Sequence, residues 1–274
     1  MHEDRVGVCS WSLRPASPAD LAACLQRLGI KAVQLALVPV AEEPAVWGDA
    51  FEQLAKADIR IASGMLATVG EDYTTLQTIA ATGGVRPDAT WPATLERAQR
   101  VAALAAENGV RLVTLHAGFI PHERTAAERS KLIERLRIVA DLFGEKGLEV
   151  ALETGQERAE TLLEALEDLD RSNVGVNFDP ANMILYGMGD PVASLARLAP
   201  HVRQLHIKDA RPTEVEGTWG TEVVAGTGAV DWPALFKVVK RIVPAVMLVI
   251  EREAGPTREA DIAVARDLVA RMLT

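Results

Sequence analysis

The sequence predicts an α/β fold in which eight parallel strands close into a (β/α)8 barrel, with one domain spanning residues 1–274. Apolar, strand-like runs alternate with helical stretches along the whole chain, and no Pro/Ser-rich linker divides them. Strands that are apolar on both faces are typical of a parallel sheet covered by helices on both sides. The length is close to the ~250 residues of a typical barrel. A doubly wound open sheet is the alternative, but it usually carries a glycine-rich phosphate turn after its first strand, and Cys9-Ser10-Trp11 is not one.

Strand runs and helix-ending signals give the elements of the first half in order. Strands are expected at Arg5–Cys9, Ala32–Leu37, Ile59–Leu66 and Arg111–Leu115. Ser17 and Pro18 are typical of the N-cap and first position of a helix, which is expected to end at Gly29. Further helices are expected over 46–56, 91–108 and 125–146. The glycine-containing stretch 67–90 is expected to form a loop over one end of the barrel, with room for a short helix.

The second half repeats the same alternation. Strands are expected over 148–153, 174–179, 202–207 and 246–251, and helices over 159–169, 191–198, 232–242 and 259–273. A long loop with several glycines, 209–230, separates the seventh strand from the next helix. Each unit is therefore one strand followed by one helix, as a parallel barrel requires.

Composition excludes several classes of partner. Asp and Glu number 38 against 29 Lys and Arg, for a formal net charge of −9, and no basic run interrupts the chain. This charge offers no footprint for nucleic acid or an anionic membrane surface. No run approaches the ~18 apolar residues of a membrane span, and the N-terminal residues show no signal-peptide core. Two cysteines, Cys9 and Cys24, are too few for a disulfide framework, so we expect a cytoplasmic protein.

Four of the strand runs end on an ionisable side chain: Glu153, Asp179, His206 and Glu251. In a barrel the C-terminal strand ends meet at one edge, where active sites lie. Three carboxylates and one imidazole suit a hard divalent ion, Mn²⁺ or Mg²⁺ first, with Co²⁺ or Zn²⁺ as alternatives. Without an ion, we expect the three carboxylates to raise one another's pKa. The competing interpretation is that each residue caps a helix or pairs with an arginine, but four equivalent positions favour the metal site.

Other polar or aromatic residues at this edge are candidate substrate contacts, each with a structural alternative. His116 ends the fourth strand run and is almost as well explained as a packing histidine. Lys208 lies two residues after His206, so both point to the same side, where Lys208 can neutralise an oxyanion. Arg211 can bind a hydroxyl or phosphate, or pair with Glu214. Asp209 can orient a ligand or cap a turn, and Trp11 and Trp219 can stack on a sugar face or pack a loop.

Short motifs occur at these strand ends: Leu115-His116-Ala117-Gly118, Leu152-Glu153-Thr154-Gly155, Asn177-Phe178-Asp179-Pro180-Ala181-Asn182, His206-Ile207-Lys208-Asp209, Val249-Ile250-Glu251, and Gly226–Trp232 before the last helices. In this order and spacing the chain resembles, over nearly its whole length, the xylose isomerase-like TIM-barrel superfamily of sugar phosphate isomerases and epimerases. The resemblance implies that Glu153 and Glu251 are metal ligands that also carry protons, with Asp179 and His206 as the remaining ligands. Barrels of this family often form homodimers, and the sequence shows no interface signal of its own.

The activity that the resemblance implies is isomerisation or epimerisation of a small carbohydrate, a sugar, sugar phosphate or inosose. One glutamate removes the proton next to the carbonyl, a metal-stabilised enediolate forms, and the other glutamate returns the proton. Ketose epimerases often carry a histidine where this chain has Asn182, and many relatives have a glutamate at Gln34. Asn182 can still bind a substrate hydroxyl, but this departure argues against a free-ketohexose epimerase.

Three other functions compete with this one, and the sequence does not separate the first of them from it. A lyase or dehydratase of a keto-sugar or inosose, as in similar inosose dehydratases, would use the same site and is the main alternative. A related DNA-repair barrel carries three zinc ions and more histidines, whereas the third strand run here ends Ser63-Gly64-Met65. A barrel that binds a metabolite without turnover would gain nothing from two acids placed to move protons.

Overall fold

Within residues 5–215, 217–242 and 245–274, which the computed structural model describes, eight parallel strands close into a barrel. The strand order is β1-β10-β7-β6-β5-β4-β3-β2, and Val8 in β1 pairs with both Val33 and Ile250, which closes the sheet. The prediction of a (β/α)8 barrel is therefore confirmed. The strands are β1 (Val6–Cys9), β2 (Ala32–Ala36), β3 (Arg60–Met65), β4 (Leu112–Leu115), β5 (Glu149–Glu153), β6 (Val174–Phe178), β7 (Val202–Ile207) and β10 (Met247–Ile250).

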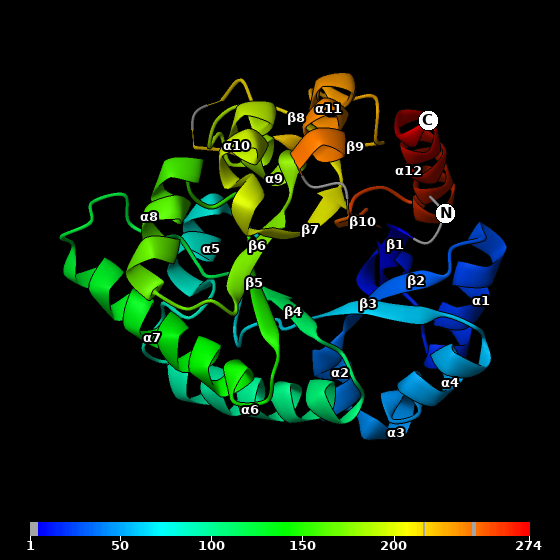
Figure 1. The fold of residues 1–274 in the computed structure, drawn as a ribbon, viewed down its shortest axis with the longest axis horizontal. Helices are drawn as coiled ribbons and strands as arrows, with labels where there is room; N and C mark the ends of the chain where they lie inside the picture. Colours follow the sequence, from blue (N-terminus) through cyan, green and yellow to red (C-terminus); the bar gives the residue numbers. More distant parts are fainter. Residues whose placement is uncertain (1–4, 216, 243–244) are drawn as a thin grey trace.

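Helices surround the strands on the outside of the barrel (Figure 1). Their start and stop signals act as the sequence predicts: Ser17 accepts a hydrogen bond from the N–H of Asp20, and Gly29 ends the first helix with φ 65°. The main helices are α1 (Pro18–Leu28), α4 (Ala50–Lys56), α6 (Trp91–Glu107), α7 (Ala127–Gly144), α8 (Ala159–Leu169), α10 (Pro191–Leu198), α11 (Trp232–Ile242) and α12 (Arg258–Leu273).

Short elements near the strand ends differ from the sequence-based expectation. The single helix expected over 46–56 is two helices, α3 (Pro44–Trp47) and α4, separated at Gly48, and α2 (Leu37–Glu42) precedes them. The loop 209–230 contains a hairpin of β8 (Asp209–Arg211) and β9 (Thr221–Val223). The remaining short elements are a 3-10 turn (Ser10–Leu13), α5 (Leu76–Thr82), α9 (Pro180–Leu185) and a 3-10 turn (Ala199–His201).

The apolar core lies between the barrel wall and the helices. Strand residues such as Val33, Val113 and Leu205 are fully buried, because helices cover the outer face of the sheet. The barrel interior is different, since several of its buried side chains are polar. These polar side chains include Gln34, Asn177 and Gln204, which lie inside the barrel near its C-terminal edge.

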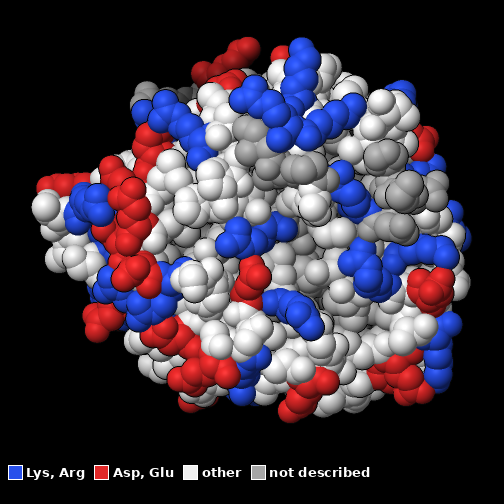
Figure 2. All heavy atoms as spheres, in the orientation of Figure 1, with Lys and Arg blue, Asp and Glu red and all other residues white. Residues whose placement is uncertain are grey.

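The outer surface carries charges of both signs, and neither sign alone covers the face shown in Figure 2. Among the helices of the described residues, none combines the length and the apolar character needed to cross a lipid bilayer. Because positive and negative side chains are mixed on the face shown in Figure 2, the net charge of −9 is not concentrated on that face.

Candidate active site

The structure brings Glu153, Asp179, His206 and Glu251 together at the C-terminal edge of the barrel. Glu153 is the last residue of β5, and Asp179 and Glu251 directly follow β6 and β10. Nδ1 of His206 lies 3.6 Å from Glu153, 3.4 Å from Asp179 and 3.4 Å from Glu251. All four side chains are buried, and their ligand atoms lie within 4.8 Å of one another. Such separations are typical of atoms that share one ion at ~2.0–2.6 Å.

The hydrogen bonding of this cluster fits a metal ion. Asp179 Oδ2 and His206 Nδ1 are completely buried, and neither has a hydrogen-bond partner among the described residues. Buried polar atoms without a partner are rare and costly, so a cation held between these two atoms and the other carboxylates would satisfy both. Asp179 Oδ1, by contrast, accepts from the N–H groups of Ala181 and Asn182 and caps α9. One oxygen of Asp179 therefore fixes the side chain while the other faces the proposed ion.

The second nitrogen of His206 is held by an amide beneath the cluster. Nε2 lies 2.8 Å from Oε1 of Gln34, which can only accept, and 3.1 Å from Nδ2 of Asn177, which can only donate. The shorter contact, with Gln34, favours the ring hydrogen on Nε2. In the neutral ring this leaves a lone pair on Nδ1, the atom that faces the carboxylates. Gln34 is itself fixed, because its Nε2 donates to Thr114 at 2.8 Å.

Further buried amides extend this arrangement across the barrel interior. Gln204 donates to Gln34 at 2.9 Å and to Asn177 at 3.2 Å, and it accepts from Ser63 at 2.6 Å. Asn177 then donates to Glu153 at 3.0 Å. We call Gln34, Ser63, Thr114, Asn177 and Gln204 the amide network; all five side chains are fully buried. The network connects His206 and Glu153 through buried hydrogen bonds.

Lys208 changes the electrostatics of the cluster. Its ammonium lies 2.8 Å from Glu251 and 2.8 Å from Glu253. Burial alone would raise the pKa of Glu251, but Lys208 and His206 hold that pKa well below its ordinary value. The pKa of Glu153 is also lowered, because His116 and His206 together outweigh its burial. The carboxylates do raise one another's pKa, since Glu251 raises that of Glu153 and that of Asp179, but Lys208 and the histidines outweigh this effect at the two glutamates. Of the three carboxylates, Asp179 has a raised pKa, caused mainly by burial.

Burial also acts on the pKa of His206 itself. Burial alone would lower the pKa of His206, but electrostatic interactions with Cys9, Glu153 and Glu251 raise this pKa well above its ordinary value. A positive ring among carboxylates and a divalent ion among the same carboxylates satisfy the same charge requirement. The three carboxylates therefore favour a positive charge at the centre of the cluster.

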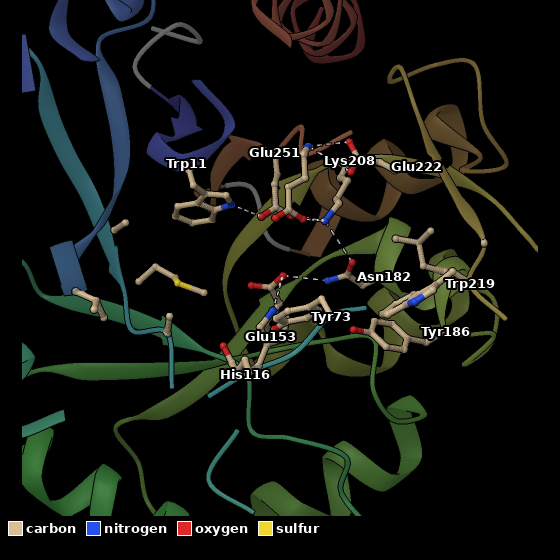
Figure 3. A pocket seen from close by; sticks show the side chains of 18 of the residues that line it. Trp11, Tyr73, His116, Glu153, Asn182, Tyr186, Lys208, Trp219, Glu222 and Glu251 are labelled. Carbon is tan, nitrogen blue, oxygen red and sulfur yellow. Dashed lines mark hydrogen bonds and ion pairs between the residues drawn. The ribbon is translucent and has the colours of Figure 1, made fainter. Parts of the chain in front are cut away.

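Five of the candidate substrate contacts line the cavity above the cluster: Trp11, His116, Asn182, Lys208 and Trp219 (Figure 3). Trp11 donates its indole N–H to Glu251 at 2.8 Å. Asn182 donates to Glu153 at 3.0 Å and accepts from Lys208 at 3.5 Å. His116 lies 3.7 Å from Glu153. Trp11 and Asn182 therefore orient the two glutamates and also border the space in which a substrate would lie.

Arg211 and Asp209 do not point into that cavity. The guanidinium of Arg211 is exposed and donates to the carbonyl of Thr227 at 2.9 Å, so the structure gives no support to a substrate contact there. Arg211 lies four residues past the end of β7, as the last residue of β8 in the β8–β9 hairpin. Asp209 is buried and organises the turn at Gly226–Trp232, so its alternative as a turn cap is correct.

Sequence reasoning overlooked several residues at the site, among them Tyr73, Tyr186, Gln204, Glu222 and Glu253. Gln204 had a usable signal, because it lies two residues before His206 on β7 and therefore faces the same side of that strand. Tyr73, Tyr186 and Glu222 come from loops and short elements whose course the sequence pattern did not predict.

A solved structure with a matching fold is that of a xylose isomerase domain protein from Planctomyces limnophilus. It is 32% identical to this chain, covers 91% of both chains and superposes with a TM-score of 0.85. The structure of an L-ribulose 3-epimerase has 16% identity, covers 98% of this chain and 94% of its own, and has a TM-score of 0.71. At that identity the second likeness shows the shared fold alone.

A curated relative matches over part of its length. A 3-dehydroshikimate dehydratase from Bacillus anthracis is 29% identical over 123 residues, which make up 42% of this chain and 43% of the relative. The family model of the xylose isomerase-like TIM barrel matches residues 21–272, nearly the whole chain. With the closed barrel and the cluster of buried acids at its C-terminal edge, this match identifies the chain as a member of the xylose isomerase-like TIM-barrel family.

Proposed function

We propose that the protein is a divalent-metal-dependent isomerase or epimerase of a keto-sugar or a similar hydroxy-ketone. The observation that carries this proposal is the pair Glu153 and Glu251, buried on separate strands and both facing the same group of ligand atoms. Glu153, Asp179, His206 and Glu251 would hold the ion. When bound, a divalent ion would polarise the carbonyl of the substrate and make the neighbouring C–H more acidic.

The two glutamates would carry the proton. One removes it from the carbon next to the carbonyl, and the other returns it to the opposite face in an epimerase or to the neighbouring carbon in an isomerase. Their low pKa values keep both as carboxylates, ready to accept a proton. Trp11 fixes Glu251 and Asn182 fixes Glu153, so each carboxylate is held in place as the proton moves.

A lyase acting on the same site is the second candidate, and the similarity to the dehydratase favours it. The first step, removal of the proton next to the carbonyl, would be the same. If the substrate has a leaving group at the β carbon, that group would depart with the electron pair in place of reprotonation at carbon. The two functions therefore differ in their products and share Glu153 and Glu251.

Deuterium exchange tests the proposal. We expect metal-stripped protein, reloaded with Mg²⁺ in D2O, to incorporate deuterium next to the carbonyl of at least one ketose, ketose phosphate or inosose, as read by proton NMR. The labelled carbon then separates an epimerase from an isomerase, and an unsaturated product identifies a lyase.

Two glutamate-to-glutamine variants, one at Glu251 and one at an exposed position, test whether Glu251 carries the proton. Glu251→Gln is expected to fold normally and to lower the exchange rate by about 10²–10⁴-fold, because the amide cannot accept the proton. Glu107→Gln, at the exposed end of α6, is the control and should exchange as the wild type does. Unchanged exchange in Glu251→Gln would contradict the assignment.

A further inference from the structure

The cavity above the proposed metal centre is larger than a single sugar ring needs. Its volume is about 680 Å³, which lies within the ~300–1,000 Å³ typical of sites for larger ligands. At ~30 Å³ for each water-sized group, it has room for on the order of twenty such groups, about twice the number of non-hydrogen atoms in a free hexose. A substrate that fills this space therefore carries a substituent beyond the sugar ring.

The charges that line this cavity are almost all negative. Among the described lining residues, five are glutamates (Glu71, Glu153, Glu222, Glu251 and Glu253) and the one Lys or Arg is Lys208. Lys208 lies 2.8 Å from Glu251, 2.8 Å from Glu253 and 4.0 Å from Asp179, so its charge is already compensated by carboxylates. Phosphate and carboxylate groups are bound by Arg or Lys charges that have no other partner. A negatively charged substrate would therefore meet repulsion here that only the metal ion offsets.

One side of the cavity is an aromatic wall. Tyr186 and Trp219 meet edge to face with ring centroids 4.8 Å apart, and Phe119 contacts the far side of Tyr186 at 5.6 Å. Figure 3 shows Tyr186 and Trp219 side by side, across the cavity from Trp11. The wall is anchored by a hydrogen bond from the N–H of Gly220 to the carbonyl of Leu185, which joins the β8–β9 hairpin to α9. The rings of this wall provide apolar surface for a ligand, and they carry no positive charge that would bind an anion.

We propose that the substrate is an uncharged keto-sugar derivative whose apolar, planar substituent lies against Tyr186 and Trp219. The sugar ring would occupy the glutamate end of the cavity, and the substituent would fill the rest. This inference rests on the proposed function and adds the substrate class to it. The charge of the lining disfavours phosphorylated sugars and sugar acids, although their carbon skeletons would fit.

The test compares matched ketones by the rate of deuterium exchange in D2O. The probes are the methyl and phenyl hexopyranosides oxidised to a ketone at the same ring carbon, and the 6-phosphate of the methyl compound. We expect kcat/KM for the phenyl compound to exceed that of the methyl compound by about 10-fold or more, because a buried ring removes its apolar surface from water. The phosphate is expected to react at least about 10-fold more slowly than the methyl compound.

Two variants locate these preferences in the lining. Trp219→Ala should bring the phenyl-to-methyl ratio toward one, whereas Trp47→Ala, on α3 and outside the cavity lining, should keep the wild-type ratio. Glu253→Gln releases Lys208 from one partner and should raise the rate with the phosphate relative to the methyl compound. The exposed Glu107→Gln variant should leave that relative rate unchanged.

The outcomes separate the inference from the function on which it rests. If all three ketones exchange but the phosphate reacts as fast as the methyl compound, or the phenyl group gives no advantage, the substrate class is wrong and the proposed function stands. If protein with bound Mg²⁺ exchanges none of these ketones and none of the ketoses and inososes above, the proposed function fails and the inference fails with it.

Discussion

The carboxylate of Asp209 illustrates how one buried side chain can organise a loop. It accepts hydrogen bonds from four backbone N–H groups and one indole, those of Ala210, Gly226, Gly228, Val230 and Trp232. Gly228 approaches so closely that a Cβ there would lie 2.1 Å from Asp209 Oδ1. The motif Gly226–Trp232 is therefore explained by a loop that folds around the carboxylate of Asp209 and donates hydrogen bonds to it.

Asp209→Ala is expected to lower the free energy of unfolding by about 2–4 kcal/mol, because it leaves several buried donors without an acceptor. Urea denaturation measures this loss. Asp231→Ala in the same loop is the control, since Asp231 accepts a hydrogen bond from Ala234 alone, at 3.0 Å, and should cost about 1 kcal/mol. Equal losses in the two variants would contradict the central role of Asp209.

Glu157 is a second residue with a consequence for stability. It is 3% exposed, and burial raises the pKa of its carboxyl to about 8. In the unfolded chain this pKa returns to its ordinary value of 4.5, so between pH 4.5 and 8 the folded state binds the proton more tightly. The contribution of this group is complete below pH 4.5 and is lost as the pH rises toward 8.

We therefore expect Glu157→Gln to be more stable than the wild type at pH 8 by a few kcal/mol, because it removes a charge that is costly to bury. At pH 5 the difference should be much smaller. Thermal unfolding across this pH range measures it, and a difference that does not change with pH would mean that Glu157 keeps an ordinary pKa in the folded protein.

The strands contribute to the site residues within their length as well as the ionisable residues at their ends. Residues two positions before a ligand on the same strand face the same interior, so Asn177 and Gln204 lie under Asp179 and His206. These amides join Gln34 on β2 in the network that orients His206. Loss of such a residue around the ligands typically lowers metal affinity by about 10–100-fold.

Gln34→Leu removes the acceptor that faces Nε2 of His206. We expect the affinity for Mn²⁺, measured by calorimetry, to fall about 10–100-fold, because the ring is no longer held with Nδ1 toward the carboxylates. Gln34→Glu keeps an acceptor oxygen and should bind Mn²⁺ more tightly than Gln34→Leu. Gln26→Leu, on the exposed face of α1, is the control. If Gln26→Leu bound Mn²⁺ as weakly as Gln34→Leu does, the loss of affinity would not come from the contact between Gln34 and His206.

The strands and the four ligands could be predicted from the sequence because strand periodicity and strand ends are local signals. Glu153, Asp179, His206 and Glu251 each end an apolar run, and parallel strands bring such ends together. The aromatic wall could not be predicted in this way. Tyr186 and Trp219 come from the end of α9 and from a hairpin, so their meeting depends on tertiary packing and on the Gly220–Leu185 hydrogen bond.

For the whole molecule, the proposed ion should act as a stabilising ligand. An ion present at 100 times its dissociation constant adds about 2.7 kcal/mol to the free energy of unfolding. We therefore expect removal of the metal by a chelator to lower Tm by roughly 5–10 °C and Mn²⁺ to restore it, as measured by calorimetry. The same treatment of Asp179→Asn should give a smaller shift, and equal shifts would place the ion elsewhere.

The closing of the barrel has a consequence for folding kinetics. In the pairing of β1 with β10, Val6 lies opposite Leu248, so the seam joins two distant parts of the chain. Closing so long a loop costs entropy before any contact compensates, and folds dominated by distant pairings form slowly. The hydrogen bond from Trp11 to Glu251 spans this seam. During refolding, the capacity to take up an ion should therefore develop with the closing of the seam, later than the collapse of the chain.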